Sequence, residues 1–257
     1  MMRKIHHSIF AALLAVGVSA VLSACQTTTP ESLKPHLAVT EPPAGAAGRP
    51  YPVVLFIQGT GGGNNRANLW AGRLAQAGIA SVAIDNAGLR GRTNLAGVAP
   101  QDVAKDYAAA LRLLQNDPRV DTNRHAVMGF SSGGTAALLA GGALEPGQPR
   151  PRAVVAFYPG VLGECAGNHP DGTNVHVFYG DLDEWGAYQG TRDACRRAVE
   201  GKASGGFHLV KGAHHGFDDT VAVTWPASGR TFRSEPNPAA TAEVERTLVP
   251  LLKAAFD

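Results

Sequence analysis

The residues of this sequence best suited to covalent chemistry are a serine, an aspartate and a histidine, in that order along the chain. Residues 129–133 read G-F-S-S-G and place Ser131 in the pattern G-x-S-x-G, between an apolar run and a run of small residues. This is the context of a sharp strand-to-helix turn that exposes a nucleophilic serine. Both glycines are needed because a Cβ would clash with the closely approaching backbone. Ser132 cannot be the centre, since position 130 is phenylalanine.

A serine hydroxyl becomes a good nucleophile only beside a base, which an acid in turn orients. Candidates for both roles follow later apolar runs: Asp181 and Asp183 after one run, and His214 and His215 after the next. Open α/β sheets bind ligands at the carboxyl ends of their strands, so we expect these side chains at one edge of the sheet. The spacing alone leaves both pairs open.

Acyl transfer to a serine also needs hydrogen-bond donors for the oxyanion that forms. The backbone N–H of Ser132, next to the nucleophile, is one expected donor. The second is expected from the loop after the first core strand, where residues 58–63 read Q-G-T-G-G-G. The N–H of Thr60 is the best candidate there, and the glycines let the backbone turn inward.

Two rival interpretations of these segments are weaker. The glycine loop imitates a dinucleotide-binding fingerprint, but Asn64 stands where the third glycine belongs. The histidines and aspartates within residues 214–219 could suggest a metal cluster, but their spacing matches no common zinc motif. We therefore expect no metal and no cofactor.

The elements that must position these residues alternate between strands and helices. Continuous apolar runs indicate strands buried on both faces, and strand–helix alternation predicts a mostly parallel sheet of about six or more strands. This is an α/β fold with no room for a large lid. The expected strands are 53–58, 80–84, 126–130, 153–158, 175–179 and 207–210, and the expected helices are 69–77, 101–115, 135–143, 187–199 and 239–256.

The first 24 residues predict a secretory signal. Arg3 and Lys4 precede an apolar run over residues 9–22, which is shorter than the roughly 20 residues of a membrane span. Residues 22–25, L-S-A-C, resemble a bacterial lipoprotein signal, which predicts lipidation of Cys25 and a periplasmic protein held by its lipid. Position 26 is Gln rather than Asp, which resembles sorting to the outer membrane. Ordinary cleavage, giving a secreted or soluble periplasmic protein, is the alternative.

Three segments are expected in the chain: the signal over 1–24, a lipidated cysteine with a flexible tether over 25–49, and one domain over 50–257. The tether is predicted from its Thr, Pro, Ala and Gly content. Removing the signal leaves 21 basic and 21 acidic residues. This balance, without a basic cluster, gives no indication of nucleic-acid binding.

Two further cysteines, Cys165 and Cys195, remain in the mature chain. An oxidising periplasm favours a disulfide between them, which would brace the loop that carries the acid. Two unpaired buried thiols are the alternative.

Several motifs resemble the dienelactone hydrolase family of the α/β hydrolases, from about residue 51 to the C-terminus. They are G-x-x-D-x-W at 180–185, A-x-H-G-F at 213–217, D-x-x-x-x-R-G at 85–91, Y-P-G at 158–160 and N-P-A-A at 237–240. The resemblance implies an α/β-hydrolase fold, with Asp183 as the acid and His215 as the base. The family proper carries cysteine in place of Ser131, so the serine version resembles a general esterase.

These residues predict a serine hydrolase that cleaves carboxylic esters or lactones of small molecules through an acyl-enzyme. Arg90 could pair with a substrate carboxylate, and Trp185 could line the acyl pocket; a solvated arginine and a packed tryptophan are the alternatives. A peptidase of the same superfamily and a non-catalytic binding lipoprotein are the competing functions. The expected partners are a small ester or lactone and the membrane that holds the lipid.

Overall fold

The computed structural model describes residues 29–44, 48–160, 165, 172–200 and 205–257. Within these residues, seven strands form one sheet in the order β1-β3-β2-β4-β5-β6-β7, and a two-stranded hairpin, β8–β9, follows. The strands are β1 (Leu37–Thr40), β2 (Tyr51–Ile57), β3 (Ala80–Ile84), β4 (Val120–Phe130), β5 (Ala153–Phe157), β6 (Asn174–Gly180), β7 (Gly205–Val210), β8 (Val223–Ala227) and β9 (Arg230–Ser234). The helices are α1 (Pro30–Leu33), α2 (Asn65–Gln76), α3 (Pro100–Leu114), α4 (Ser132–Ala143), α5 (Glu184–Tyr188), α6 (Thr191–Val199) and α7 (Pro238–Phe256), with 3-10 turns η1 (Lys34–His36) and η2 (Gly88–Arg90).

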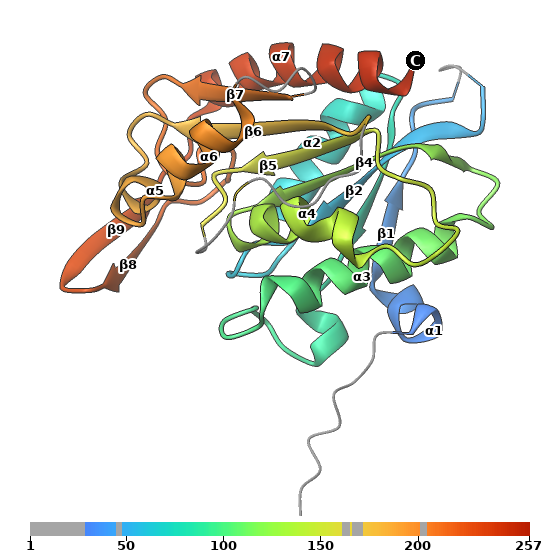
Figure 1. Ribbon diagram of the computed structural model, residues 1–257, viewed down its shortest axis with the longest axis horizontal. Coiled ribbons are helices and arrows are strands. Elements are labelled where there is room, and N and C mark those ends of the chain that lie inside the picture. The colour runs from blue at the N-terminus through green and yellow to red at the C-terminus, as the bar shows by residue number, and fades with distance from the viewer. Residues whose placement is uncertain (1–28, 45–47, 161–164, 166–171, 201–204) are drawn as a thin grey trace, which may run out of the picture.

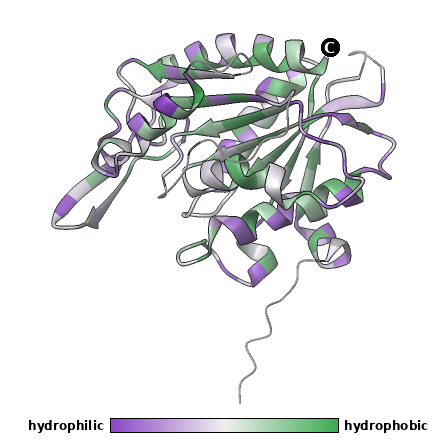
Figure 2. Ribbon diagram, in the orientation of Figure 1, coloured by the Kyte–Doolittle hydropathy of each residue, from purple (hydrophilic) through white to green (hydrophobic). Residues whose placement is uncertain are grey.

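Helices cover both faces of the sheet. Helices α3, α4 and α6 pack on one face, and α2 and α7 lie on the other (Figure 1). Strands β2 to β7 pair in parallel, and every residue of β3 and β5 is buried. Figure 2 shows the central strands in the hydrophobic colour, as burial on both faces requires. The predicted α/β fold with a mostly parallel sheet is confirmed.

The N-terminal part of the fold differs from the expected tether over 25–49. Strand β1 pairs antiparallel with β3, and Leu33, just before it, is fully buried. The folded domain therefore begins before residue 50. The polar and proline-rich surroundings hid this short edge strand from a composition argument. Cys25 and the predicted signal lie outside the described residues.

The acid-bearing side of the sheet is more divided than the sequence suggested. The helix expected over 187–199 is two helices, α5 and α6, separated at Gly190, whose φ of +69° favours glycine. Cys195 on α6 forms a disulfide with Cys165, whose side chain is also buried. The disulfide expectation is met, and the bridge ties α6 to the chain that follows β5.

The hairpin β8–β9 was not predicted. Its turn residues Ser228 and Gly229 both have positive φ, +50° and +72°, which suits the tight right-handed twist of a two-residue hairpin. The hairpin projects from the end of the sheet beside α5 (Figure 1). It therefore lies at the end of the sheet where the acid and the base were expected.

Candidate active site

Ser131 occupies a strained turn between β4 and α4. Its backbone has φ 54° and ψ −120°, a conformation that residues with a Cβ rarely adopt. Close packing enforces this turn: a Cβ on Gly129 would lie 1.9 Å from the Gly133 carbonyl oxygen, and a Cβ on Gly133 would lie 2.2 Å from the Gln58 carbonyl oxygen. The two glycines of the pattern thus allow the turn that presents the serine hydroxyl.

Three side chains from three separate loops meet at this turn. Ser131 Oγ lies 3.1 Å from Nε2 of His215, and Nδ1 of His215 lies 2.9 Å from Oδ2 of Asp183. Since a carboxylate only accepts, the Nδ1–H of His215 donates to Asp183, and Nε2 keeps the lone pair that can receive the serine proton. This tautomer is the one that a general base requires.

The acid is held in one orientation. Asp183 is 1% exposed, and its second oxygen, Oδ1, accepts the N–H of Gly186 at 2.9 Å. Asp181, the competing candidate, is exposed and accepts the N–H of Gly212 at 2.7 Å, which links the acid loop to the histidine loop. The structure therefore brings Asp183, and not Asp181, to His215.

The competing histidine has a different environment. Arg233 can only donate, so Nε2 of His214 accepts from it at 2.8 Å, and Nδ1–H donates to the carbonyl of Leu182 at 2.9 Å. Both ring nitrogens of His214 are thus used in joining β9 to the acid loop. His215 remains as the histidine that contacts Ser131.

The two backbone N–H groups expected as oxyanion donors belong to Thr60, in the glycine loop, and to Ser132, directly after the serine. Ser132 is the first residue of α4, so its N–H has no partner inside the helix. In the described part of the chain, the N–H of Thr60 makes no backbone hydrogen bond, while its carbonyl accepts from Leu95 at 2.8 Å. The Thr60 hydroxyl donates to Ser132 Oγ at 2.8 Å, which joins the glycine loop to the elbow.

The glycine loop is held in place by hydrogen bonds of the Gln58 backbone and side chain. The N–H of Gln58 donates to Asn86 at 3.2 Å, the side-chain oxygen of Gln58 accepts the N–H of Ala87 at 3.2 Å, and its NH₂ donates to Asn64 at 2.8 Å. These bonds fasten the loop to the end of β3. A loop held in this way can keep its N–H groups aimed at a developing negative charge.

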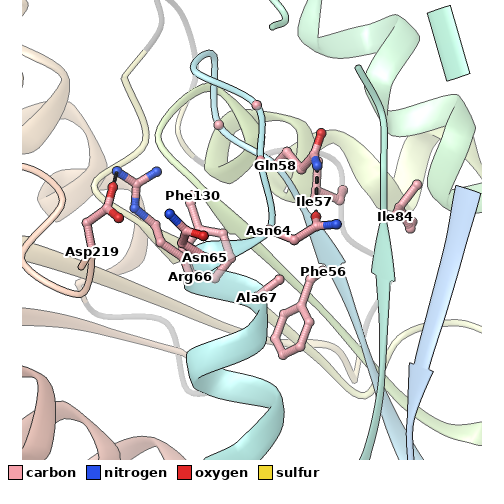
Figure 3. Close-up of a pocket in the computed structure, with 13 residues that line it drawn as sticks. Phe56, Ile57, Gln58, Asn64, Asn65, Arg66, Ala67, Ile84, Phe130 and Asp219 are labelled. Carbon is pink, nitrogen blue, oxygen red and sulfur yellow. Dashed lines mark hydrogen bonds and ion pairs between the residues drawn. The ribbon is translucent and has the colours of Figure 1, made fainter. Parts of the chain in front are cut away.

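A cavity of about 50 Å³ lies under this loop (Figure 3). Gln58, Asn64 and Arg66 line it, and Arg66 points from α2 toward Asp219, with which it forms an ion pair. The volume has room for a few water molecules, and Ser131 does not line it. The cavity lies between the glycine loop and the start of α2.

A buried polar cluster packs against the His215 ring, and the sequence analysis did not identify it. The ring of Tyr158, at φ +36°, packs 4.6 Å from the His215 ring, and its hydroxyl donates to Asp218. The indole N–H of Trp70 donates to the other oxygen of Asp218 at 2.7 Å. Burial raises the pKa of the Asp218 carboxyl, although Arg66 and the two hydrogen bonds act in the opposite direction. The only sequence signal was an aspartate directly after H-G-F.

The two expected substrate residues differ in position. The Arg90 guanidinium bonds the Asp106 carboxylate at 2.6 and 3.2 Å and the carbonyl of Asn86 at 2.9 Å. These contacts tie Arg90 to α3 and give no support to the substrate-binding prediction. Trp185 is half-buried, and a Cβ placed on Gly160 would lie 3.3 Å from both its Nε1 and Ser131 Oγ. Its indole therefore borders the serine.

The described ranges contain no group of three His, Cys, Asp or Glu side chains placed to share a metal ion. Among the same residues, no helix combines the length and apolar character that crossing a bilayer requires.

The comparisons with known proteins agree with this architecture. The sequence matches the dienelactone hydrolase family over residues 38–256. In structure, the chain is similar to a dienelactone hydrolase from Anabaena variabilis, with 19% identity, 85% of this chain and 90% of that chain covered, and a TM-score of 0.60. It is also similar to the carboxylesterase Cest-2923 from Lactobacillus plantarum, with 18% identity, 86% and 92% covered, and a TM-score of 0.60.

A third similar structure is a serine hydrolase without a lid from Xanthomonas campestris, with 18% identity, 85% and 86% covered, and a TM-score of 0.55. No curated protein matches the chain in sequence. At these identities, the structural similarities show the fold alone.

Proposed function

This chain belongs to the dienelactone hydrolase family and is a hydrolase, and we propose that it cleaves carboxylic esters or lactones of small molecules through an acyl-enzyme on Ser131. The observation that carries the proposal is the continuous hydrogen-bonded chain from Ser131 through His215 to Asp183. The strained elbow and the two backbone N–H groups beside it fit the same chemistry.

The proposed reaction has two halves. Ser131 Oγ attacks the acyl carbon as its proton passes to Nε2 of His215, and the oxyanion lies against the N–H groups of Thr60 and Ser132. The bond to the alcohol oxygen then breaks, and His215 returns the proton to that oxygen. In the second half, His215 takes a proton from water, the hydroxide attacks the acyl group, and the acid leaves as Ser131 regains its proton. Asp183 keeps the imidazole oriented and stabilises its charged form.

Hydrolysis of p-nitrophenyl esters of increasing acyl length by the purified protein tests this proposal. We expect turnover of short esters that is lost in Ser131→Ala. Absence of turnover in the wild type, together with a serine that a fluorophosphonate does not label, would instead favour a binding protein on this fold.

The neighbouring residues offer matched controls. Asp183→Asn leaves His215 without its acceptor, and we expect kcat to fall by about 10⁴-fold. Asp181→Asn removes a carboxylate two residues away that does not contact His215, so it should retain most activity. Equal losses in the two variants would contradict the assignment of Asp183 as the acid.

We further propose that Cys25 is lipidated and holds the domain at the outer membrane from the periplasmic side. The support is the sequence L-S-A-C directly after the short apolar run. Labelled palmitate should be incorporated into the wild-type chain in cells and not into Cys25→Ser. Incorporation that persists in Cys25→Ser would refute the anchor.

A further inference from the structure

Three aromatic side chains form a cluster beside the proposed catalytic residues, and we call Trp185, Trp225 and Phe232 the aromatic cluster. The ring of Trp185 meets that of Phe232 edge to face at 4.8 Å and that of Trp225 at 5.8 Å, and Trp225 stacks on Phe232 at 6.1 Å. Trp185 belongs to α5, directly after the acid loop, while the other two rings come from the hairpin β8–β9.

The hairpin fixes which of its side chains face the cluster. Trp225 and Phe232 are directly opposite each other across the two strands, so their side chains share one face. Thr224, one residue away on β8, points to the other face and is exposed. Phe232 is 2% exposed, whereas Trp225 and Trp185 are half-buried. Phe232 thus supports two indoles whose remaining surface is open to a ligand.

The aromatic cluster begins at the reacting groups. The Trp225 ring lies 5.7 Å from the His215 ring, in an edge-to-face arrangement. Trp185 Nε1 and Ser131 Oγ each lie 3.3 Å from the position of a Cβ added to Gly160. A molecule bound covalently at Ser131 would therefore have aromatic surface within reach.

The geometry of the proposed reaction decides which part of an ester meets this surface. The carbonyl oxygen must point to the N–H groups of Thr60 and Ser132. The alcohol oxygen must lie within hydrogen-bond reach of His215 Nε2, which returns the proton to it. Trp225 packs against His215, so the aromatic cluster lies within reach of the group attached to the alcohol oxygen.

We propose that the aromatic cluster is the binding subsite for the alcohol portion of the ester and that it takes a flat aromatic ring. This inference rests on the proposed function and narrows it to esters of arylmethanols and phenols. Two partly exposed indoles over a buried phenyl ring favour an aromatic ligand over an aliphatic one of equal size, because edge-to-face and offset contacts add to the burial of area.

Kinetics with four esters test the subsite: benzyl acetate, cyclohexylmethyl acetate, ethyl acetate and ethyl phenylacetate. The first two differ in aromaticity at nearly equal size and leaving-group basicity, and the last carries its ring on the acyl side. We expect kcat/KM for benzyl acetate to exceed that for cyclohexylmethyl acetate by roughly three- to ten-fold. Trp225→Leu should remove this preference, Trp225→Phe should retain most of it, and Thr224→Ala, on the opposite face, should not change it.

The outcomes separate this inference from the proposed function. Hydrolysis of ethyl acetate without an aromatic preference, or a preference that persists in Trp225→Leu, overturns the subsite alone. The assignment to the alcohol side is overturned if ethyl phenylacetate is preferred over ethyl acetate while benzyl acetate is not preferred over cyclohexylmethyl acetate. If p-nitrophenyl esters are hydrolysed and none of the four esters is, the subsite alone is overturned. If neither set is hydrolysed and a fluorophosphonate does not label Ser131, both are overturned.

Product inhibition gives a test that needs no variant. Benzyl alcohol should inhibit the wild-type hydrolysis of ethyl acetate more strongly than cyclohexylmethanol does. Equal inhibition by the two alcohols would overturn the subsite even if every Trp225 variant failed to fold.

Discussion

Replacing the elbow serine with glycine should stabilise the fold while it removes activity. Ser131 has φ 54° and ψ −120°, and a residue with a Cβ held in such a conformation costs of order 1–3 kcal/mol. Ser131→Ala keeps the Cβ and therefore the strain, whereas Ser131→Gly removes both. The two variants lose the same hydrogen bond to His215, so the difference between them isolates the backbone.

The expected magnitude follows from two opposing effects. At an ordinary position, replacing alanine with glycine costs about 0.4–1 kcal/mol through the extra freedom of the unfolded chain. Relief of about 1–3 kcal/mol of strain at Ser131 exceeds this cost. We expect Ser131→Gly to be more stable than Ser131→Ala by about 1 kcal/mol, which corresponds to a Tm higher by about 2–4 °C in a chain of this size.

Urea unfolding and calorimetry of both variants provide the measurement. The pair Ser132→Gly and Ser132→Ala is the control, because Ser132 begins α4 and the glycine variant should there be the less stable one. If Ser131→Gly is less stable than Ser131→Ala by the ordinary 0.4–1 kcal/mol, the elbow stores no strain and the reasoning is refuted.

Three other perturbations have outcomes that the structure defines. Gly133→Ala places a Cβ 2.2 Å from a carbonyl of the glycine loop and should abolish ester hydrolysis. Gly142→Ala, with open space in the same helix, should retain hydrolysis and raise stability. Equal rates of hydrolysis in the two variants would contradict the steric account. Burial lowers the pKa of His125 from 6.5 to about 4, so the unfolded chain takes up a proton at this histidine first as the pH falls. The free energy of unfolding should therefore decrease between pH 6.5 and 4 by about 3 kcal/mol more in the wild type than in His125→Gln, as urea unfolding would measure. The Cys165–Cys195 disulfide closes a loop of 30 residues, so replacing both cysteines with serine should cost about 3.5 kcal/mol, and an unchanged Tm would show that the loop is constrained by other contacts.

The sheet and the elbow were predictable because their signals are local. Buried parallel strands are continuous apolar runs, and the elbow needs two glycines at fixed spacing around one serine. The family resemblance selected Asp183 and His215. Spacing alone could not, since the acid follows its strand in a turn, where the alternation of side chains along a strand no longer applies.

The parts that the sequence did not reveal depend on contacts between distant segments. Arg90 was interpreted from its place after a strand, but its partner Asp106 lies on the next helix. Asp218 was considered only as part of a possible metal cluster, yet Trp70 and Tyr158 donate to it from separate elements. The hairpin was missed because Pro226 argues against a strand, and proline is tolerated here because each strand of a two-stranded ribbon is an edge strand.

The most direct test of the central claim is mass spectrometry of the protein after reaction with a fluorophosphonate. An activated serine should form one covalent adduct, on the peptide that carries Ser131, and Ser131→Ala should form none. An unlabelled wild-type protein, or an adduct that persists in Ser131→Ala, would contradict the assignment of Ser131 as the nucleophile.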